Sequence, residues 1–377
     1  MSVMNRRKQI FFLLSWNDYR IFQGISRYAH EASWRMDTRH FFTNQIPRDR
    51  VFHGMIAMGH RDPAVNAFVR EKAQTVPTVI LGTDSPGVDA PKVVPDNRRI
   101  ARLAAQHLYD LFHKDYGWFA CDTSPSGMER KEAFQERLGE LGMACVDLSG
   151  ARSPYHPAVT LALLKACRKP IGVLCRDDHD AAVLLELCQE ARLVVPEEVA
   201  VVGVGDLESL CSFSTVPTTS VSPDMDTLGY QAAMVLDQLM QGNPVPEITV
   251  VPPGPLIRRY STGCLAITHP NLQQAVREID TRFNEALTME EIASAAGVSR
   301  RQLYTLFQRE MRGSPHHYIL DVRLEYAKKQ IGERVLPLHQ IARSCGFNTA
   351  RTLNRVFQQR FGMSPSKWAK IGQGRPV

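Results

Sequence analysis

The fold of the C-terminal part is decided by two stretches that repeat each other, IASAAGVSRRQLYTLFQREMRGSP (residues 292–315) and IARSCGFNTARTLNRVFQQRFGMSP (residues 341–365). Matched positions lie 49 residues apart up to the glycine of each copy, Gly297 and Gly346, and 50 apart beyond the turn, because the second copy has one inserted residue. Each copy has the pattern of a short helix, a turn at the glycine and a second, basic helix with one apolar face.

The residues around each turn fit this pattern. Gly297 and Gly346 suit the left-handed conformation that ends a helix, and Ser299 is a suitable N-cap for the helix that follows. We therefore predict two helix-turn-helix units, the first at about 289–311 and the second at about 338–361. A plain helical bundle with solvated arginines on its outer face is the alternative, and the tandem repetition argues against it.

Charge is distributed unevenly along the 377 residues. The chain contains 45 Lys+Arg and 39 Asp+Glu, a formal net charge of +6. Residues 268–377 hold 17 basic and 9 acidic residues (+8), which leaves 28 basic and 30 acidic residues (−2) for residues 1–267. A basic end joined to a near-neutral body is typical of proteins that bind nucleic acid. The predicted partner of this end is a double-stranded DNA operator.

The repeat resembles the AraC-type DNA-binding domain over about residues 272–371. Leu353 stands where that family has Phe, and Trp368-Ala369 stand where it has Tyr-Arg. In that family the second helix of each unit enters the major groove, where an arginine fork can read guanine O6 and N7. The resemblance implies base contacts by Arg301, Tyr304, Thr305, Arg351 and Arg355, and we expect backbone contacts by Arg300, Arg309, Asn354 and Gln358.

Residues 9 to about 259 alternate short apolar runs with amphipathic segments. The predicted strands are Ile10–Leu14, Gly54–Met58, Thr78–Leu81, Trp118–Cys121, Ile171–Cys175 and Val199–Val204, and the predicted helices include Ile100–Leu111, Ala133–Leu141, Ala181–Ala191 and Gly229–Met240. Such a pattern is typical of parallel sheets covered on both faces, and its length suits two lobes. The stretch Val251–Pro255 is expected to mark the end of this body. We predict a two-lobed α/β domain over 1–265 and an all-α domain over 266–377.

The body resembles the effector domain of LacI-type regulators and periplasmic sugar-binding proteins. The stretches that carry the resemblance include Glu129–Phe134, Val195–Gly203, Leu228–Ala233 and Arg258–Thr262. It implies a periplasmic-binding-protein-like fold with a small sugar effector between the lobes, where polar side chains converge at the C-terminal ends of strands. The candidate effector contacts at predicted strand ends are Trp16, Asn17, Asp18, Asp96, Arg130, Asp177 and Asp206; the resemblance itself assigns Asp96, Arg130 and Asp177.

Several of these residues have alternative interpretations. Asp96 and Asp178 could cap helices, and Trp16 could pack in the core. The run Asp177–Asp180 has residue types that bind metals, but four consecutive residues cannot all face one ion, so no metal is predicted.

The region around Gly205 shows one departure from the LacI-type pattern. That family has Asp where Gly205 stands, so either the neighbouring Asp206 takes over a sugar contact or the contact is missing. Gly203-Val204-Gly205 lacks the third glycine of a dinucleotide fingerprint, and no cofactor is predicted.

The order of the two domains resembles that of xylose-operon regulators. This favours a pentose effector such as xylose, and an activator rather than a repressor. We also expect a homodimer that associates through the α/β body, and RNA polymerase is a candidate further partner.

Two rival functions are weighed. A DNA alkyl-damage methyltransferase with an AraC-type module needs a zinc-held acceptor cysteine and a Pro-Cys-His type motif, which this sequence lacks. A sugar-binding transport protein needs a signal peptide, and the apolar run Ile10–Leu14 is too short for one. Eight cysteines without a Cys-x-x-Cys pair favour free thiols in a reducing compartment. We expect a cytoplasmic protein that is neither an enzyme nor bound to a membrane.

Overall fold

The computed structural model describes residues 7–14, 18–39, 46, 50–84, 87–149, 156–333 and 336–371. The chain divides into two compact units, Met1–Leu265 and Ala266–Val377. The first unit contains two sheets with their helices, and the described residues of the second unit form helices without strands. This architecture confirms the predicted fold class.

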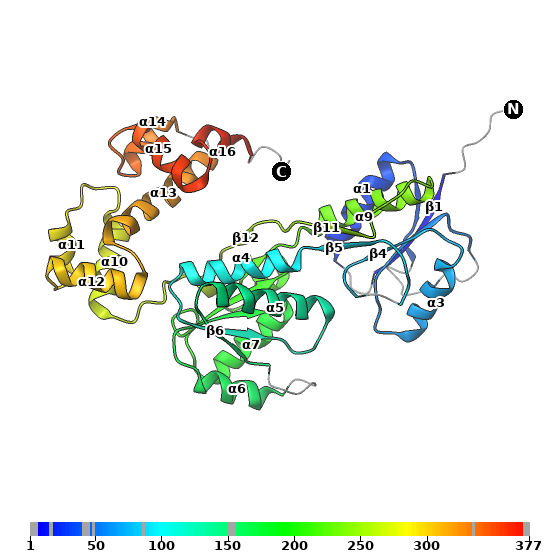
Figure 1. The fold of residues 1–377 in the computed structure, drawn as a ribbon, viewed down its shortest axis with the longest axis horizontal. Helices are drawn as coiled ribbons and strands as arrows, with labels where there is room; N and C mark the ends of the chain where they lie inside the picture. The colour runs from blue at the N-terminus through cyan, green and yellow to red at the C-terminus, as the bar shows by residue number, and fades with distance from the viewer. Residues whose placement is uncertain are drawn as a thin grey trace. The chain divides into compact units, whose positions relative to one another are not determined.

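The first unit has two lobes, each built on a six-stranded sheet (Figure 1). The sheet of the first lobe runs in the order β11-β5-β4-β3-β1-β2, with β1 (Gln9–Leu13), β2 (Arg35–Asp37), β3 (Gly54–Ala57), β4 (Thr78–Leu81), β5 (Lys92–Pro95) and β11 (Ile248–Val251). The sheet of the second lobe runs in the order β12-β10-β9-β8-β6-β7, with β6 (Asp115–Phe119), β7 (Cys145–Asp147), β8 (Ile171–Cys175), β9 (Val199–Val204), β10 (Thr219–Val221) and β12 (Leu256–Ile257). Among the described strands, every pair is parallel except β10 with β12.

Helices cover both faces of each sheet because successive strand residues point to opposite sides. In the first lobe, Phe12 of β1 belongs to the core formed with α1 (Tyr19–Glu31) and α9 (Met225–Met240), whereas Phe11 belongs to the core formed with α3 (Pro63–Ala73). In the second lobe, α4 (Asn97–Asp110) and α5 (Pro125–Glu140) cover one face, and α6 (Pro157–Ala166) and α7 (Asp178–Glu190) cover the other.

The longer elements follow the sequence prediction more closely than the short ones. All six predicted strands are present, but β2, β7, β10 and β12 have only two or three residues, too few to show a periodic pattern. Helix α5 begins at Pro125, not near the predicted Ala133. The side chain of Ser124 caps it, and proline suits a first helical turn.

The prediction that Val251–Pro255 ends the body was wrong. Val251 is the last residue of β11 in the first lobe, and Leu256 is the first residue of β12 in the second lobe. The prolines therefore carry the chain between lobes, a task that needs the same extended backbone as a domain linker. The chain also crosses after β5 into α4 and after β10 into α9, and the short helices α8 (Glu208–Cys211) and η1 (Tyr260–Thr262) complete the body.

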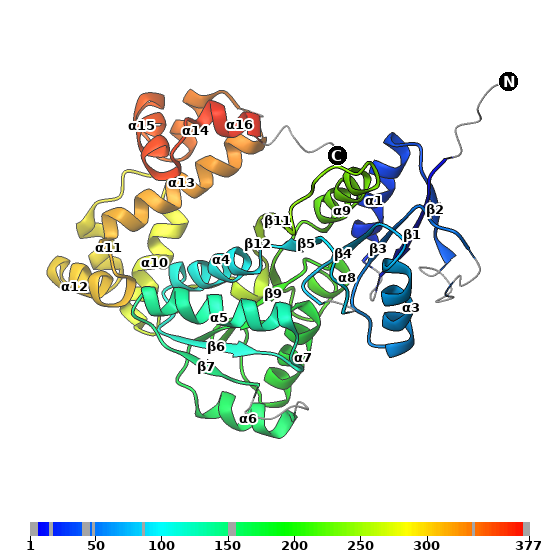
Figure 2. The same cartoon turned by 45° about the vertical axis from the view of Figure 1, so that its right-hand side comes forward.

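The second unit contains both predicted helix-turn-helix pairs. Its helices are α10 (Pro270–Arg282), α11 (Met289–Ala295), α12 (Arg300–Met311), α13 (Pro315–Glu333), α14 (Leu338–Ser344), α15 (Ala350–Phe361) and α16 (Pro365–Ile371). The long helix α13 packs against α12 of the first pair and against α14 and α15 of the second (Figure 2). None of the described helices is long and apolar enough to cross a membrane.

Helices α1 and α9 approach each other closely at two glycines. A Cβ atom added to Gly24 would lie 2.0 Å from the carbonyl oxygen of Asp226, and one added to Gly229 would lie 2.2 Å from the carbonyl oxygen of Ile21. Both distances are far below van der Waals contact, so the packing of α1 on α9 requires glycine at these two positions.

We predict that Gly24→Ala lowers the free energy of unfolding by about 1–3 kcal/mol, because the added methyl group forces the two helices apart. Urea denaturation measures the change. Gly139→Ala in α5 is the matched control, because an added Cβ there meets nothing within 4 Å. The control is expected to gain up to about 1 kcal/mol from helix propensity. Equal effects of the two substitutions would contradict the close approach of α1 and α9.

His107 of α4 is tied to the last segment of the body. Its Nε2 atom lies 2.9 Å from Oγ1 of Thr262, to which it is hydrogen-bonded. Burial, together with the charges of Arg258 and His113, lowers the pKa of His107 to about 4. The folded protein therefore holds a neutral imidazole at pH values where the unfolded chain, with a pKa of about 6.5, binds a proton.

Because the unfolded state binds more protons, we predict that His107 lowers stability as the pH falls from about 6.5 towards 4, by up to about 1.4 kcal/mol per pH unit. His107→Gln keeps a polar partner for Thr262 but does not titrate. Urea denaturation at pH 7 and pH 5 is expected to show a smaller loss for the variant than for the wild type. The same pH dependence in both proteins would rule out His107 as a source of acid sensitivity.

Candidate DNA-binding face and strand-end cluster

The second helix of each helix-turn-helix pair is fixed by a cap and a turn. Ser299 caps α12: its hydroxyl accepts from the Gln302 backbone, and the Gln302 side chain accepts from the Ser299 backbone. Thr349 caps α15 by accepting from the Thr352 backbone. The turns before them contain Gly297 with φ 65° and Gly346 with φ 75°. The predicted cap at Ser299 and the predicted left-handed glycines are confirmed.

The buried face of these helices decides which residues point outward. Leu303 and Phe307 of α12 are 0% exposed, as are Leu353 and Phe357 of α15. With the leucine and phenylalanine held in the core, the positions that share the opposite face of a helix recur at i, i+3, i+4 and i+7. In α15 these are Arg351, Asn354, Arg355 and Gln358, all exposed.

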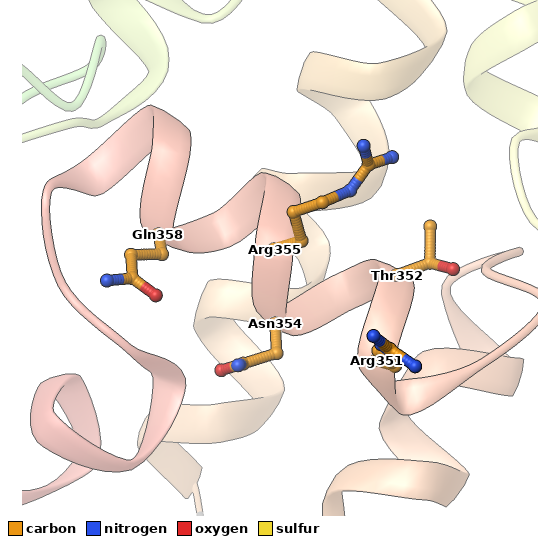
Figure 3. A pocket seen from close by; sticks show the side chains of 5 residues that line it. All are labelled: Arg351, Thr352, Asn354, Arg355 and Gln358. Atoms are coloured by element: carbon orange, nitrogen blue, oxygen red, sulfur yellow. The ribbon is translucent and has the colours of Figure 1, made fainter.

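All four contacts predicted on α15 lie together, and Thr352, which was not predicted, lies with them. Figure 3 shows Arg351, Thr352, Asn354, Arg355 and Gln358 around one surface hollow on α15. Helix α15 contains three arginines and no acidic residue. Among the described residues, Arg351 and Arg355 form no ion pair, so their guanidinium groups are available to an external acceptor. We call this surface the α15 face.

The equivalent surface of α12 carries Arg301, Tyr304 and Thr305, as the sequence predicts. Gln308 also belongs to it and was missed, although the repeat maps Gln358 onto Gln308. Arg300 and Arg309 lie at its margin and pair with acidic neighbours: the distance from Arg300 to Glu290 is 2.8 Å, and that from Arg309 to Glu310 is 2.9 Å.

Of the predicted effector contacts, only Arg130 and Asp177 lie close together; the others are outside the described residues or are bound to neighbours of their own. Trp16 and Asn17 lie outside the described residues. Asp18 is buried, caps α1 and pairs with Arg20 at 2.7 Å, and Asp96 caps α4 by accepting from the Arg99 backbone at 2.9 Å. Capping, the alternative interpretation of Asp96, is thus what the structure shows.

Asp206 is already committed to a neighbour. Its carboxylate pairs with Arg259 at 2.7 Å, and its backbone N–H donates to the hydroxyl of Ser220 at 3.0 Å. Both contacts lie within the second lobe, so Asp206 has little freedom to replace the family's sugar-contacting Asp.

Gly205 has a structural reason to differ from that Asp. Its φ is 136°, and an added Cβ would lie 2.8 Å from the Asp178 carboxylate. Asp178 is 2% exposed and accepts from the hydroxyl of Ser220 at 2.6 Å and from the Leu207 backbone at 2.8 Å. The interpretation of Asp178 as a helix cap was wrong, because the carboxylate that caps α7 belongs to Asp177.

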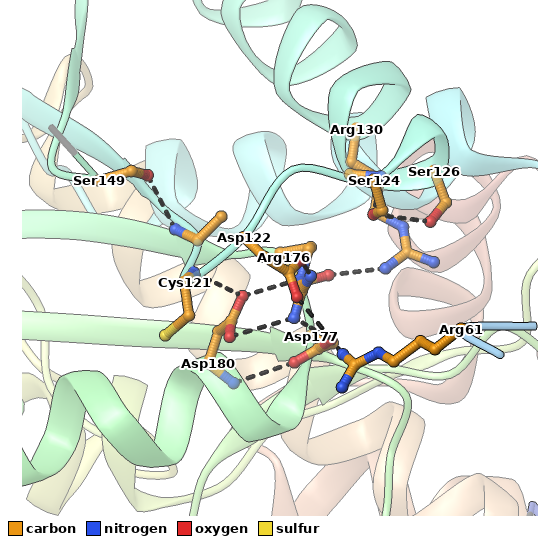
Figure 4. A network of polar contacts seen from close by, with 12 residues as sticks. Arg61, Cys121, Asp122, Ser124, Ser126, Arg130, Ser149, Arg176, Asp177 and Asp180 are labelled. Carbon is orange, nitrogen blue, oxygen red and sulfur yellow. Dashed lines mark hydrogen bonds and ion pairs between the residues drawn. The ribbon is translucent and has the colours of Figure 1, made fainter. Parts of the chain in front are cut away.

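Arg130 and Asp177 lie close together beyond the ends of strands β6 and β8. The Arg130 guanidinium is buried; its Nε donates to Asn97 at 2.9 Å and its Nη1 donates to the Arg176 carbonyl at 2.6 Å. Burial lowers the pKa of Arg130, and the nearest carboxylates, Asp177 first, oppose that change. Arg176 in turn pairs with Asp177, at 3.2 Å, and with Asp180, at 2.8 Å (Figure 4).

The first lobe adds two residues that sequence reasoning missed. Arg61, which follows β3, extends towards Asp122 of the second lobe at 3.6 Å (Figure 4). Asp84 follows β4; partial burial of its carboxylate raises its pKa, and the guanidinium groups of Arg176 and Arg130 oppose the rise. We call Arg61, Asp84, Asp122, Arg130, Arg176 and Asp177 the strand-end cluster.

The strand-end cluster consists of carboxylates and guanidinium groups, which are hydrogen-bonding groups. Across the described ranges, no group of three or more His, Cys, Asp or Glu side chains could hold a metal ion. All eight cysteines are free, and burial raises the pKa of the nearest one, Cys121, to about 12, which disfavours a thiolate.

Two family matches cover most of the two units. Residues 105–262 match the family described as periplasmic binding protein-like domain, and residues 292–371 match the family described as helix-turn-helix domain. The first match spans the strands of the second lobe together with α9 and β11 of the first, and the second match spans nearly all of both helix-turn-helix pairs.

Two curated proteins and one solved structure are similar to this chain over most of its length. The chain is 24% identical to the xylose operon regulatory protein of Haemophilus influenzae (strain ATCC 51907 / DSM 11121 / KW20 / Rd) over 372 residues, 93% of this chain and 94% of the relative. It is 25% identical over 288 residues to the protein of the same name from Escherichia coli (strain K12), 74% of each chain. The solved structure of the xylose-binding transcription activator xylR shares the fold, with a TM-score of 0.59, 23% identity and coverage of 97% of this chain and 99% of that one. The relatives are regulators, and neither rival function has a counterpart among these three proteins.

Proposed function

We propose that this transcription regulator, a homologue of the xylose operon regulatory proteins, is controlled by a small sugar that binds at the strand-end cluster between the two lobes of its body. The carrying observation is that the cluster draws on both lobes: Asp84 comes from the first, and Arg130 and Asp177 come from the second. A ligand held by both sides stabilises one arrangement of the lobes, and that is what a regulator needs.

The donors and acceptors of the cluster suit a polyhydroxylated ligand. A guanidinium has five N–H groups, and Arg130 uses two of them, on Asn97 and on the Arg176 carbonyl. A sugar hydroxyl can accept from Arg130 and donate to Asp84, so adjacent hydroxyls of one ring bridge the lobes. Neither group has a direct ionic partner among the described residues, which leaves both available to such a ligand.

The effector is a pentose such as xylose, in keeping with the names of the relatives. Sugar binding changes how a homodimer presents its α12 and α15 faces to an operator, and the regulator activates transcription, with RNA polymerase as a further partner, in the cytoplasm. A dimer doubles the operator length that is read and follows the two-fold symmetry that most soluble oligomers adopt.

We predict that Arg351→Ala weakens specific DNA binding by about 1–3 kcal/mol and relaxes base preference at one position, because it removes a fork that reads a base edge. Selection of bound duplexes from a random library, followed by fluorescence anisotropy on the selected operator, measures both effects. Arg360→Ala on the same helix is the matched control, because Arg360 pairs with Asp321 at 3.3 Å and lies off the α15 face. An equal loss on every sequence would make Arg351 a phosphate contact and overturn its assignment to a base.

We predict that Asp84→Asn reduces the stabilisation of the protein by D-xylose, because the amide has one neutral accepting oxygen where the carboxylate has two charged ones. Sugar at 100 times its Kd adds about 2.7 kcal/mol to the stability of the wild type, which a melting curve detects. Asp89→Asn is the control: Asp89 is exposed and lies in the same connection between β4 and β5. Asp84 is a better test position than Asp177, whose replacement also removes the cap of α7.

The result that contradicts the effector site is a D-xylose response in Asp84→Asn equal to that of the wild type. If no monosaccharide of a panel of pentoses and hexoses shifts the melting point of the wild type, sugar sensing itself is wrong. The assignment of the α12 and α15 faces to DNA does not depend on that result.

A further inference from the structure

A side chain of the first lobe is bound to the backbone of the second lobe at the end of β9. Arg20, in the first turn of α1, donates from Nη2 to the carbonyl oxygen of Gly205 at 2.8 Å and from Nη1 to the carbonyl oxygen of Asp206 at 3.1 Å. The partners are 185 and 186 residues away in the sequence. These two bonds join the lobes directly, without a ligand.

The guanidinium that makes these bonds is held from its own lobe. Asp18, 3% exposed at its side chain, accepts from Arg20 Nε at 3.0 Å and from Nη2 at 2.7 Å. Asp18 also caps α1, so its carboxylate is fixed by the helix end. With four contacts made by one planar fork, Arg20 has little freedom to turn away from the second lobe.

The acceptors on the second lobe are presented by an unusual backbone. Gly205 has φ 136° and Asp206 has φ 51°, so two successive residues adopt positive φ. A positive φ is costly for Asp206, and such conformations persist where the surroundings hold them. Here Asp206 donates to Ser220, and the next residue, Leu207, donates to Asp178. The turn directs two consecutive carbonyl oxygens to one guanidinium.

The same turn is also bound to the last segment of the body, residues 257–263, which we call the exit segment. The Asp206 carboxylate pairs with Arg259 at 2.7 Å, and the Arg259 backbone N–H donates to the hydroxyl of Thr219 at 2.8 Å. Arg259 directly precedes η1, which ends three residues before Leu265, the last residue of the first unit. Contacts therefore run without a break from α1 of the first lobe to the exit segment.

We propose that Arg20 is a positioning residue for the regulatory response: it holds the two lobes together at the turn after β9, and the Asp206–Arg259 ion pair passes the position of that turn to the exit segment. A ligand at the strand-end cluster then acts on lobes that already share one contact, and any change in that contact reaches the segment before the DNA-binding unit. The inference concerns the protein alone and does not depend on the identity of the effector.

Hydrogen exchange of the full-length protein, without sugar or DNA, tests the contact. Arg20→Gln is expected to raise exchange about tenfold in residues 203–211 and in residues 257–263. The first segment loses its hydrogen bonds to the Arg20 guanidinium, and the second is bound to the first through the Asp206–Arg259 ion pair. Arg27→Gln is the matched control on the same helix. Arg27 pairs with Asp226 at 2.8 Å within the first lobe, so its loss leaves both segments unchanged.

Arg20→Lys keeps a positive charge beside the buried Asp18, and it replaces Arg20→Gln in the experiment if that variant does not fold. A lysine ammonium cannot reach Asp18 and both carbonyls together, so faster exchange in the same two segments is expected. If a folded Arg20 variant exchanges like the wild type at residues 203–211, or gains exchange equally throughout the body, the contact does not hold the lobes and the proposal is overturned.

A double-mutant cycle tests the transmission to the exit segment. Arg259→Gln alone is expected to raise exchange in residues 257–263, and adding Arg20→Gln is then expected to raise it little further, although residues 203–211 still respond. Such non-additivity is the sign of two residues that act through one path. Additive effects on residues 257–263 would separate Arg20 from the exit segment and overturn the transmission.

Discussion

Strands that are buried on both faces leave charged side chains only one place near the sheet, the ends of the strands. All residues of β8 and β9 are buried, and charged or turn-forming residues follow at once: Arg176 and Asp177 after β8, Gly205 and Asp206 after β9. Because neighbouring strands are parallel, these ends meet at one edge of each sheet. The strand-end cluster and the contact of Arg20 both follow from this constraint, since each joins the edge of one lobe to the edge of the other.

In the second unit, two buried aromatic rings determine which faces of the helices are exposed. Two short helix pairs cannot each bury a large core, so the fully buried Phe307 and Phe357 anchor the two second helices at equivalent positions of the repeat. Once these rings are fixed, the exposed faces of α12 and α15 follow from helix geometry alone. We propose that the arginines of those faces make each a surface for DNA.

The sequence predicts those parts that depend on local pattern. The cap at Ser299, the left-handed Gly297 and Gly346, and the buried strands can all be read from neighbouring residues. Asp84 could not be found in this way. It follows β4 in a polar turn, and it becomes a candidate effector contact only because the fold brings it near Arg130 and Arg176 of the other lobe.

Residues whose partners are distant in sequence were the ones assigned least well. For the family's Asp at position 205 the sequence left two possibilities, a substitute contact by Asp206 or no contact, and it gave no sign that the Asp206 carboxylate is bound to Arg259, 53 residues away. Val251–Pro255 was taken as a boundary because prolines mark linkers, and only the pairing of β11 and β12 with different sheets shows that it joins two lobes. In both cases the deciding information lies in tertiary pairing.

The proposed function requires that occupancy of the strand-end cluster and binding of DNA by the α12 and α15 faces are coupled. The most direct test is calorimetric titration of the full-length protein with D-xylose, in the presence and in the absence of a saturating selected operator duplex. Coupling of the usual size predicts a Kd for D-xylose that differs by about 5- to 150-fold between the two titrations, matched by the same factor in the effect of the sugar on DNA affinity. Two identical Kd values would contradict the account.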